Sequence, residues 1–190
     1  QTAYLKTFFP SHYMAAFLTF ESQAQKVSDW IPYLEDCKRC QFIDPATGET
    51  VRTGVEVRPP NVNLSQADFA VVHEEGEERL ASTGHVRFGL RALKGAGSKA
   101  IEAIIAERDR EGRAYSSLHD FCERVPPGTV NKATIESLVK SGAFDEVHSR
   151  DERASMVATI DSAVSAGQKL AADRAAGQGA LFGAPADDEP

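Results

Sequence analysis

Residues 87–105 read RFGLRALKGAGSKAIEAII, and this stretch decides how the middle of the chain folds. Apolar residues recur at helical spacing on both sides of a centre, residues 93–97, that holds two glycines. Gly95 and Gly97 permit a positive φ and carry no Cβ that would keep another backbone away. Ser98 can cap the helix that follows. The stretch therefore predicts a short helix, a tight turn and a second helix from about Ser98.

This arrangement is a helix-hairpin-helix pattern, and its turn is suited to bind a phosphate. The first N–H groups of a helix have no partners within the helix, and the helix dipole places partial positive charge beside them. Lys94 and Lys99 add charge on either side of the turn. The alternative is an ordinary helical corner whose glycines only solve a packing problem.

The distribution of charge favours the phosphate interpretation. The chain of 190 residues carries 21 Lys and Arg against 28 Asp and Glu, a net charge of -7. From residue 79 to residue 101 there is no acid but there are five basic residues, Arg79, Arg87, Arg91, Lys94 and Lys99. A local basic cluster on an acidic protein is typical of a nucleic-acid contact. We therefore predict DNA contacts at Arg87, Lys94, Gly95, Ala96, Gly97, Ser98 and Lys99.

A weaker copy of this pattern follows further along the chain. Residues 130–139 predict a helix, residues 140–144 read KSGAF, and a long helix is expected from about Arg150 to Ala172. We predict Ser141 and Gly142 as a second backbone contact, although this turn has one glycine only.

The rest of the chain predicts a mainly α fold with a small β subdomain. Pro10 suits a first helical position, and a second helix is expected from about Gln23 to Cys40. Turn residues and alternating apolar residues predict short strands within residues 50–57, 67–72 and 85–88.

The three cysteines do not indicate a disulfide framework or a metal site. Their odd number suits a reducing compartment, and no apolar run approaches the roughly 20 residues of a membrane span, so we expect a cytoplasmic protein without membrane contact. Cys37 and Cys40 form a C-x-x-C pair, but zinc would need two further ligands and the histidines are scattered. We interpret the pair as structural and expect no metal site.

The C-terminal residues have the composition of a flexible linker. Residues 173–190 are rich in Ala, Gly, Asp and Pro, yet Gln178, Leu181 and Phe182 stand among them. Two large apolar residues in such a tail favour a short linear motif that docks into a pocket on a partner. The alternative is that Leu181 and Phe182 fold back onto the parent protein.

Taken together, these stretches resemble the bacterial replicative DNA polymerase III alpha subunits. The matching segments are AYLK (3–6), YMAA (13–16), PPNVN (59–63), ADF (67–69), RFGL (87–90), KGAG (94–97), FCER (121–124), NK (131–132) and SGAFD (141–145). The resemblance implies the later part of a helical fingers domain with the β subdomain in residues 1–80. It implies a tandem helix-hairpin-helix unit in residues 81–172 and a linker with a clamp motif of the Q-x-x-L-F type in residues 173–190.

The resemblance also implies partners and a division of labour. The partners would be duplex primer-template DNA, the sliding clamp through Gln178, Leu181 and Phe182, and other subunits of the polymerase holoenzyme. In the family, catalytic aspartates that hold Mg²⁺ precede this region, so we assign no catalytic residue or cofactor here. We expect the chain, which starts without methionine, to be a cut piece that does not polymerise alone. Residues 41–53 look like an insertion, and Cys40 replaces a residue that is commonly apolar.

Two other functions remain open at this point. A helix-hairpin-helix DNA-repair enzyme would need a catalytic residue beside the hairpin, for which Asp109 and Asp120 are candidates by their place in the sequence. A structural helical domain would make no nucleic-acid contact at all.

Overall fold

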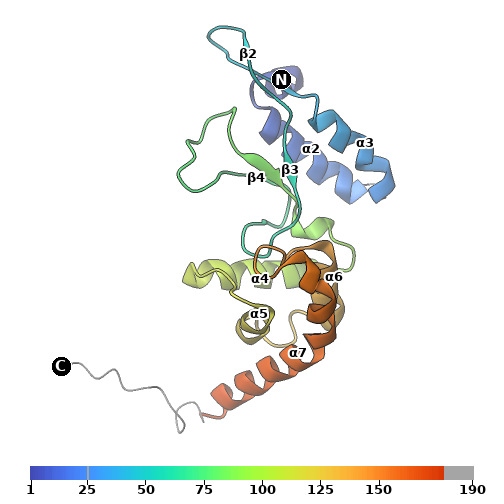
Figure 1. Ribbon diagram of the computed structural model, residues 1–190, viewed down its shortest axis with the longest axis vertical. Coiled ribbons are helices and arrows are strands. Elements are labelled where there is room, and N and C mark those ends of the chain that lie inside the picture. The colour runs from blue at the N-terminus through green and yellow to red at the C-terminus, as the bar shows by residue number, and fades with distance from the viewer. Residues whose placement is uncertain (25, 178–190) are drawn as a thin grey trace, which may run out of the picture.

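The structure, a computed structural model, describes residues 1–24 and 26–177, and these form two bodies joined end to end (Figure 1). The N-terminal body contains helices α1 (Thr2–Phe8), α2 (Pro10–Ala24) and α3 (Val27–Cys37). The C-terminal body contains helices α4 (Ser98–Glu111), α5 (Leu118–Arg124), α6 (Lys132–Ser141) and α7 (Arg153–Ala175). The expected class, mainly α with a small β part, is confirmed.

The N-terminal body is built around a core that α2, α3 and the strands share. Met14 and Leu18 of α2 are fully buried, and Trp30 of α3 packs against them. The indole of Trp30 also meets the ring of Phe69 edge to face, with centroids 6.0 Å apart. Helix α2 begins at Pro10, as predicted, because proline lacks the N–H group that the first helical residue cannot use.

Two small sheets lie beside these helices. Strand β5 (His85–Arg87) is the centre of a three-stranded sheet, with β3 (Val57–Arg58) parallel on one side and β4 (Ala70–Val72) antiparallel on the other. Strands β1 (Gln41–Ile43) and β2 (Thr50–Thr53) form a separate antiparallel hairpin. The residues expected to be an insertion therefore make a hairpin of their own, and the two strands expected within residues 50–57 belong to different sheets.

The C-terminal body packs its helices around one apolar core. Ile101 and Ile104 of α4, Phe121 of α5 and Leu138 of α6 are fully buried there. The short 3-10 helices η1 (Leu90–Ala92) and η2 (Arg150–Glu152) precede α4 and α7. The α-helical part of the last helix thus begins at Arg153, three residues later than expected.

Helices α5 and α7 cross so closely that the crossing needs a glycine. A Cβ placed on Gly167 of α7 would collide with the backbone carbonyl of Cys122 in α5. Gly167 therefore sets how closely α7 lies against the rest of the body.

Residues 59–66 join the two bodies. The N–H of Val62 donates to the carbonyl of Ala143 (2.8 Å) after α6, and Arg108 of α4 donates to the carbonyl of Ser65 (2.8 Å). Arg87 of β5 is 3% exposed and donates to Glu146 (2.9 Å) and to the carbonyl of Pro59 (3.3 Å). These bonds hold the two cores against one another; the predicted domain division after residue 80 stays a prediction.

The cysteine pair belongs to the N-terminal core. Cys37 and Cys40 are buried, and burial raises the pKa of Cys37 to about 12. A buried, protonated thiol packs like a small apolar side chain. Burial also raises the pKa of Cys40, so both side chains serve packing. None of the described helices is both long and apolar enough to span a bilayer.

Candidate nucleic-acid interface

The turn at residues 93–97 has an open, glycine-dependent geometry between η1 and α4. Gly95 has φ of 86°, in the left-handed region that L side chains rarely adopt. Gly97 has φ of -70° and ψ of 144° and occupies the N-cap position of α4. A Cβ on either glycine would have no atom within 4 Å, so the backbone here faces open space. The predicted hairpin is confirmed, but Ser98 is the first residue of α4 rather than its cap, because the chain turns at Gly97.

The carbonyl groups of the turn are held on its inner side by α6. Ser137 donates its hydroxyl to the carbonyl of Lys94 (2.8 Å), and Thr134 donates to that of Gly95 (3.2 Å). Thr134 is 1% exposed, so this contact is shielded from water. Sequence reasoning missed both residues. Their signal is weak, because two hydroxyls three positions apart on a helix do not reveal which turn they face.

Several N–H groups of the turn have no hydrogen-bond partner. Among the described residues, the N–H groups of Gly95, Gly97, Ser98 and Lys99 donate to no acceptor. They stand at the start of a helix of 14 residues, where the dipole adds partial positive charge. The arrangement offers several donors to one anion, as in other helix N-termini that bind phosphate.

Some basic side chains around the turn form ion pairs and others do not. Lys94 and Lys99 are exposed, and neither forms an ion pair within residues 1–24 and 26–177. Arg91 instead pairs with Asp68 (3.1 Å) and Glu102 (3.4 Å). Arg87 is buried in the joint between the bodies, so it is not placed to meet a surface ligand. The charge available at the turn is that of the two lysines.

The second predicted contact has a different geometry. Gly142 has φ of 88°, but it closes the end of α6 with its N–H donating to Val139 and that of Ala143 donating to Leu138. The guanidinium of Arg153, paired with Asp145, lies directly against Gly142. The Ser141 hydroxyl donates to the carbonyl of Leu138 (2.9 Å). The structure therefore makes this turn a covered helix end without open N–H groups, which corrects the expected second hairpin at Ser141 and Gly142.

The connection from α5 to α6 provides an open turn instead. Gly128 has φ of 80° with no atom within 4 Å of a Cβ, and it is exposed. The Asn131 side chain caps α6 by accepting from the N–H of Thr134 (2.8 Å). The N–H groups of Lys132 and Ala133 have no acceptor in the described part of the chain. Since Thr134 also touches Gly95, the starts of α4 and α6 lie next to one another.

The acidic residues considered for repair chemistry have structural partners. Asp109 is exposed and accepts from the Arg108 guanidinium (2.8 Å). Burial alone would raise the pKa of Asp120, but the N–H of Ser116 and the guanidinium of Arg124 hold it below its usual value. Both carboxylates are thus engaged by neighbouring guanidinium groups, so they give the repair-enzyme alternative no support.

Comparison with known proteins assigns the fold. The family model described as the helix-hairpin-helix motif matches residues 54–155, which is more than half of the chain and includes both open turns. The chain therefore belongs to the helix-hairpin-helix family.

Its similarity to individual proteins extends over almost the whole sequence. The chain is 36% identical over 183 residues to DNA polymerase III subunit alpha of Haemophilus influenzae, a match that covers 96% of the chain and 14% of that relative. It is 38% identical over 162 residues to the protein of that name from Thermus aquaticus, covering 85% of the chain and 11% of the relative. The chain thus spans about a seventh of the length of the curated relatives it matches.

The predicted clamp motif lies outside the described residues. Gln178, Leu181 and Phe182 follow the last described residue, Gly177. Their role stays a prediction from the sequence.

Proposed function

We propose that this chain is the part of a replicative DNA polymerase that holds the backbone of duplex DNA. The observation that carries the proposal is the turn at residues 93–97, where four N–H groups and two unpaired lysines face solvent together. The match to the helix-hairpin-helix family and the similarity to DNA polymerase III alpha subunits support the proposal, because a DNA polymerase must stay on DNA.

The geometry supports backbone positioning without base recognition. One phosphate would accept from the N–H groups of Gly97, Ser98 and Lys99, and the lysine side chains would add charge from either side. The turn at residues 125–131 offers a second phosphate the open N–H groups of Lys132 and Ala133, while the Lys132 ammonium pairs with Asp161 (2.7 Å). This second contact replaces the one expected at Ser141 and Gly142.

Such a grip is weak by itself and depends on salt. With roughly two to four phosphates engaged, the logarithm of the association constant falls with the logarithm of salt concentration with a slope of about -2 to -4. The net charge of -7 argues against broad non-specific attraction, so the contact must be local.

A second element of the proposed function is attachment to the sliding clamp. Leu181 and Phe182 would fill an apolar pocket on the clamp, and the Gln178 amide would hydrogen-bond at its rim. The support for this element is the sequence of the tail and its match to the Q-x-x-L-F pattern.

The substitution Gly97→Val tests the DNA contact without disturbing the fold. Valine accepts the φ and ψ of Gly97 and has free space there, but its branched side chain would stand between the N–H groups and a phosphate. We expect at least about tenfold weaker binding of a short blunt duplex, because a hydrogen bond to a charged group contributes about 1.5–3 kcal/mol. Fluorescence anisotropy at several salt concentrations measures this loss.

Two further variants complete the experiment. Lys94→Gln with Lys99→Gln should lower affinity and flatten the salt slope, whereas Lys169→Gln on the exposed face of α7 removes a charge and should change little. Duplex affinity that survives Gly97→Val, in a protein with an unchanged melting temperature, would show that the turn does not bind phosphate.

A further inference from the structure

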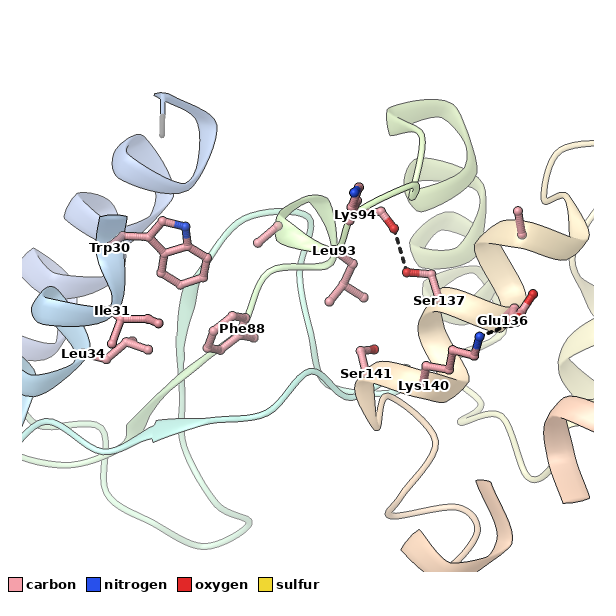
Figure 2. A pocket seen from close by; sticks show the side chains of 12 residues that line it. Trp30, Ile31, Leu34, Phe88, Leu93, Lys94, Glu136, Ser137, Lys140 and Ser141 are labelled. Atoms are coloured by element: carbon pink, nitrogen blue, oxygen red, sulfur yellow. Dashed lines mark hydrogen bonds and ion pairs between the residues drawn. The ribbon is translucent and has the colours of Figure 1, made fainter. Parts of the chain in front are cut away.

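A groove of about 600 Å³ runs between the two bodies, next to the proposed phosphate turn (Figure 2). One wall is α3, the floor is the segment from Phe88 to Leu93, and the other wall is the exposed face of α6. Leu93 and Lys94 belong to both the groove and the turn. A ligand that occupies the turn therefore lies at the mouth of the groove.

The groove combines an apolar surface with exposed side chains that the fold does not cover. Ile31 is 51% exposed although its neighbour Trp30 is buried in the core of the N-terminal body. Leu34 and Phe88 lie beside it and are half-buried. The volume lies within the range of about 300–1,000 Å³ that is usual for small-ligand pockets.

The polar side chains that line the groove leave one positive charge unpaired. Trp30 is 2% exposed, yet its indole N–H finds no acceptor among the described residues. This nitrogen is covered by its neighbours, so the Trp30 side chain offers the groove no hydrogen-bond donor. Lys94 carries a free charge, and the acid of the lining, Glu136, is neutralised by Lys140 (2.5 Å). The groove is thus apolar and weakly cationic.

We propose that this groove takes an unpaired nucleotide at the end of the duplex held by the turn. The inference rests on the proposed function, since the backbone on the turn is what brings the nucleotide to the groove. Every base has a flat face that stacks on apolar side chains and an edge with carbonyl or ring-nitrogen acceptors. Ile31, Leu93 and Phe88 would contact the face, and Lys94 would meet the adjoining phosphate.

The apolar pair of the chain's own tail, Leu181 and Phe182, cannot reach the groove. Helix α7 begins beside the groove, where Arg153 donates to the carbonyl of Lys140 (3.2 Å), and its 23 residues carry it about 35 Å away. Leu181 follows Ala175 by six positions, which span about 20 Å at most. A peptide from another protein is left as the competing occupant. The free ammonium of Lys94 and its place on the turn favour DNA.

Binding of matched DNA molecules to the full chain tests this inference. Three probes share one short duplex: a blunt form, one with a two-nucleotide 5′ extension and one with a two-nucleotide 3′ extension, with 2-aminopurine as the first unpaired base. We expect one of the extended probes to bind about fivefold or more tightly than the blunt duplex, with quenched 2-aminopurine fluorescence. Ile31→Ser should remove most of this advantage and restore fluorescence, while leaving affinity for the blunt duplex unchanged.

The matched control is Val51→Ser, which alters an apolar side chain 57% exposed on the hairpin of β1 and β2, outside the groove. Equal affinities for all three probes, or an advantage that survives Ile31→Ser, would overturn the groove assignment and leave a peptide as its occupant. A protein that does not bind the blunt duplex, but still binds a single strand in a way that depends on Ile31, would instead reject the duplex grip and leave the groove assignment standing.

Discussion

The hydroxyl of Thr134 is the residue-scale contact that orients the phosphate turn. It lies in the first turn of α6, is shielded from water and donates to the carbonyl of Gly95. The Gly95 carbonyl shares its peptide group with the N–H of Ala96, which donates to the carbonyl of Leu93 (3.2 Å), so both ends of this peptide group are held. The orientation of the turn against α6 therefore depends on a side chain about 40 positions further along the chain.

Thr134→Val keeps the shape of this side chain and removes its donor. We expect a loss of about 1 kcal/mol in the free energy of unfolding, since the Gly95 carbonyl loses a partly buried hydrogen bond, together with severalfold weaker binding of a blunt duplex because the turn is held less firmly. Urea unfolding and anisotropy measure the two effects. Ser155→Ala removes a similar hydroxyl-to-carbonyl bond (2.7 Å) on the exposed side of α7 and serves as the control. Equal duplex affinities for the two variants would exclude an orienting role for Thr134.

Residue by residue, sequence reasoning predicted the turn better than it predicted the charges around it. Gly95 was identifiable because positive φ and an absent Cβ are properties of glycine itself. Arg87 was misleading because a basic residue in a basic stretch looks solvated, whereas here the strand position of β5 buries it and Glu146 pairs with it. Burial of a charge depends on a partner 59 positions away, which local sequence does not show.

Among the secondary-structure elements, the crossing of α5 and α7 depends on Gly167. In an isolated helix, replacing glycine by alanine stabilises by about 1 kcal/mol. At this crossing the added methyl group would collide with the backbone of Cys122, which cannot move without displacing α5.

We therefore expect Gly167→Ala to destabilise the protein by about 1–3 kcal/mol, as overpacked cores do. Thermal or urea unfolding measures whether the free energy of unfolding falls or rises. The control, Ser165→Ala, changes an exposed position on the same helix and should have little effect. A more stable Gly167→Ala protein would mean that the two helices are not in close contact.

Sequence reasoning located most elements but confused two kinds of glycine turn. The helices from Pro10 and Ser98 begin where periodicity and local chemistry indicated. Gly142 was taken for a hairpin turn, because a glycine after a helix can equally close that helix or open the next. The side chain that decides between them, Arg153, reaches Gly142 from another helix. The turn with Gly128 passed unnoticed because its two prolines look like a simple helix stop.

At the scale of the whole molecule, the two proposed attachments reinforce one another. A duplex contact with few phosphates and a short linear motif are each weak, but together they would keep the chain at high effective concentration on one DNA molecule. The acidic net charge is compatible with this arrangement, since it limits binding elsewhere.

Replacing Leu181 and Phe182 by alanine should separate the two attachments. We expect at least about tenfold weaker binding to the purified clamp, because each buried side chain of this size contributes about 1.5–3 kcal/mol, and unchanged affinity for a blunt duplex. Surface plasmon resonance with immobilised clamp measures the first, and anisotropy the second. Leu80→Ala, at a position 47% exposed in the N-terminal body, is the matched control. If the unaltered protein, the double alanine variant and Leu80→Ala all bind the clamp equally well, the tail is not the tether.

The joint at residues 59–66 has a mechanical consequence. Because Val62, Ser65 and Arg87 connect both cores by backbone and buried side-chain bonds, a pull on the C-terminal body is not borne by the covalent chain alone. Tension from a moving duplex would pass through this joint into the sheet around β5 and on to α2 and α3. The N-terminal body, whose α3 lines the proposed nucleotide groove, would therefore carry part of the load on a bound duplex.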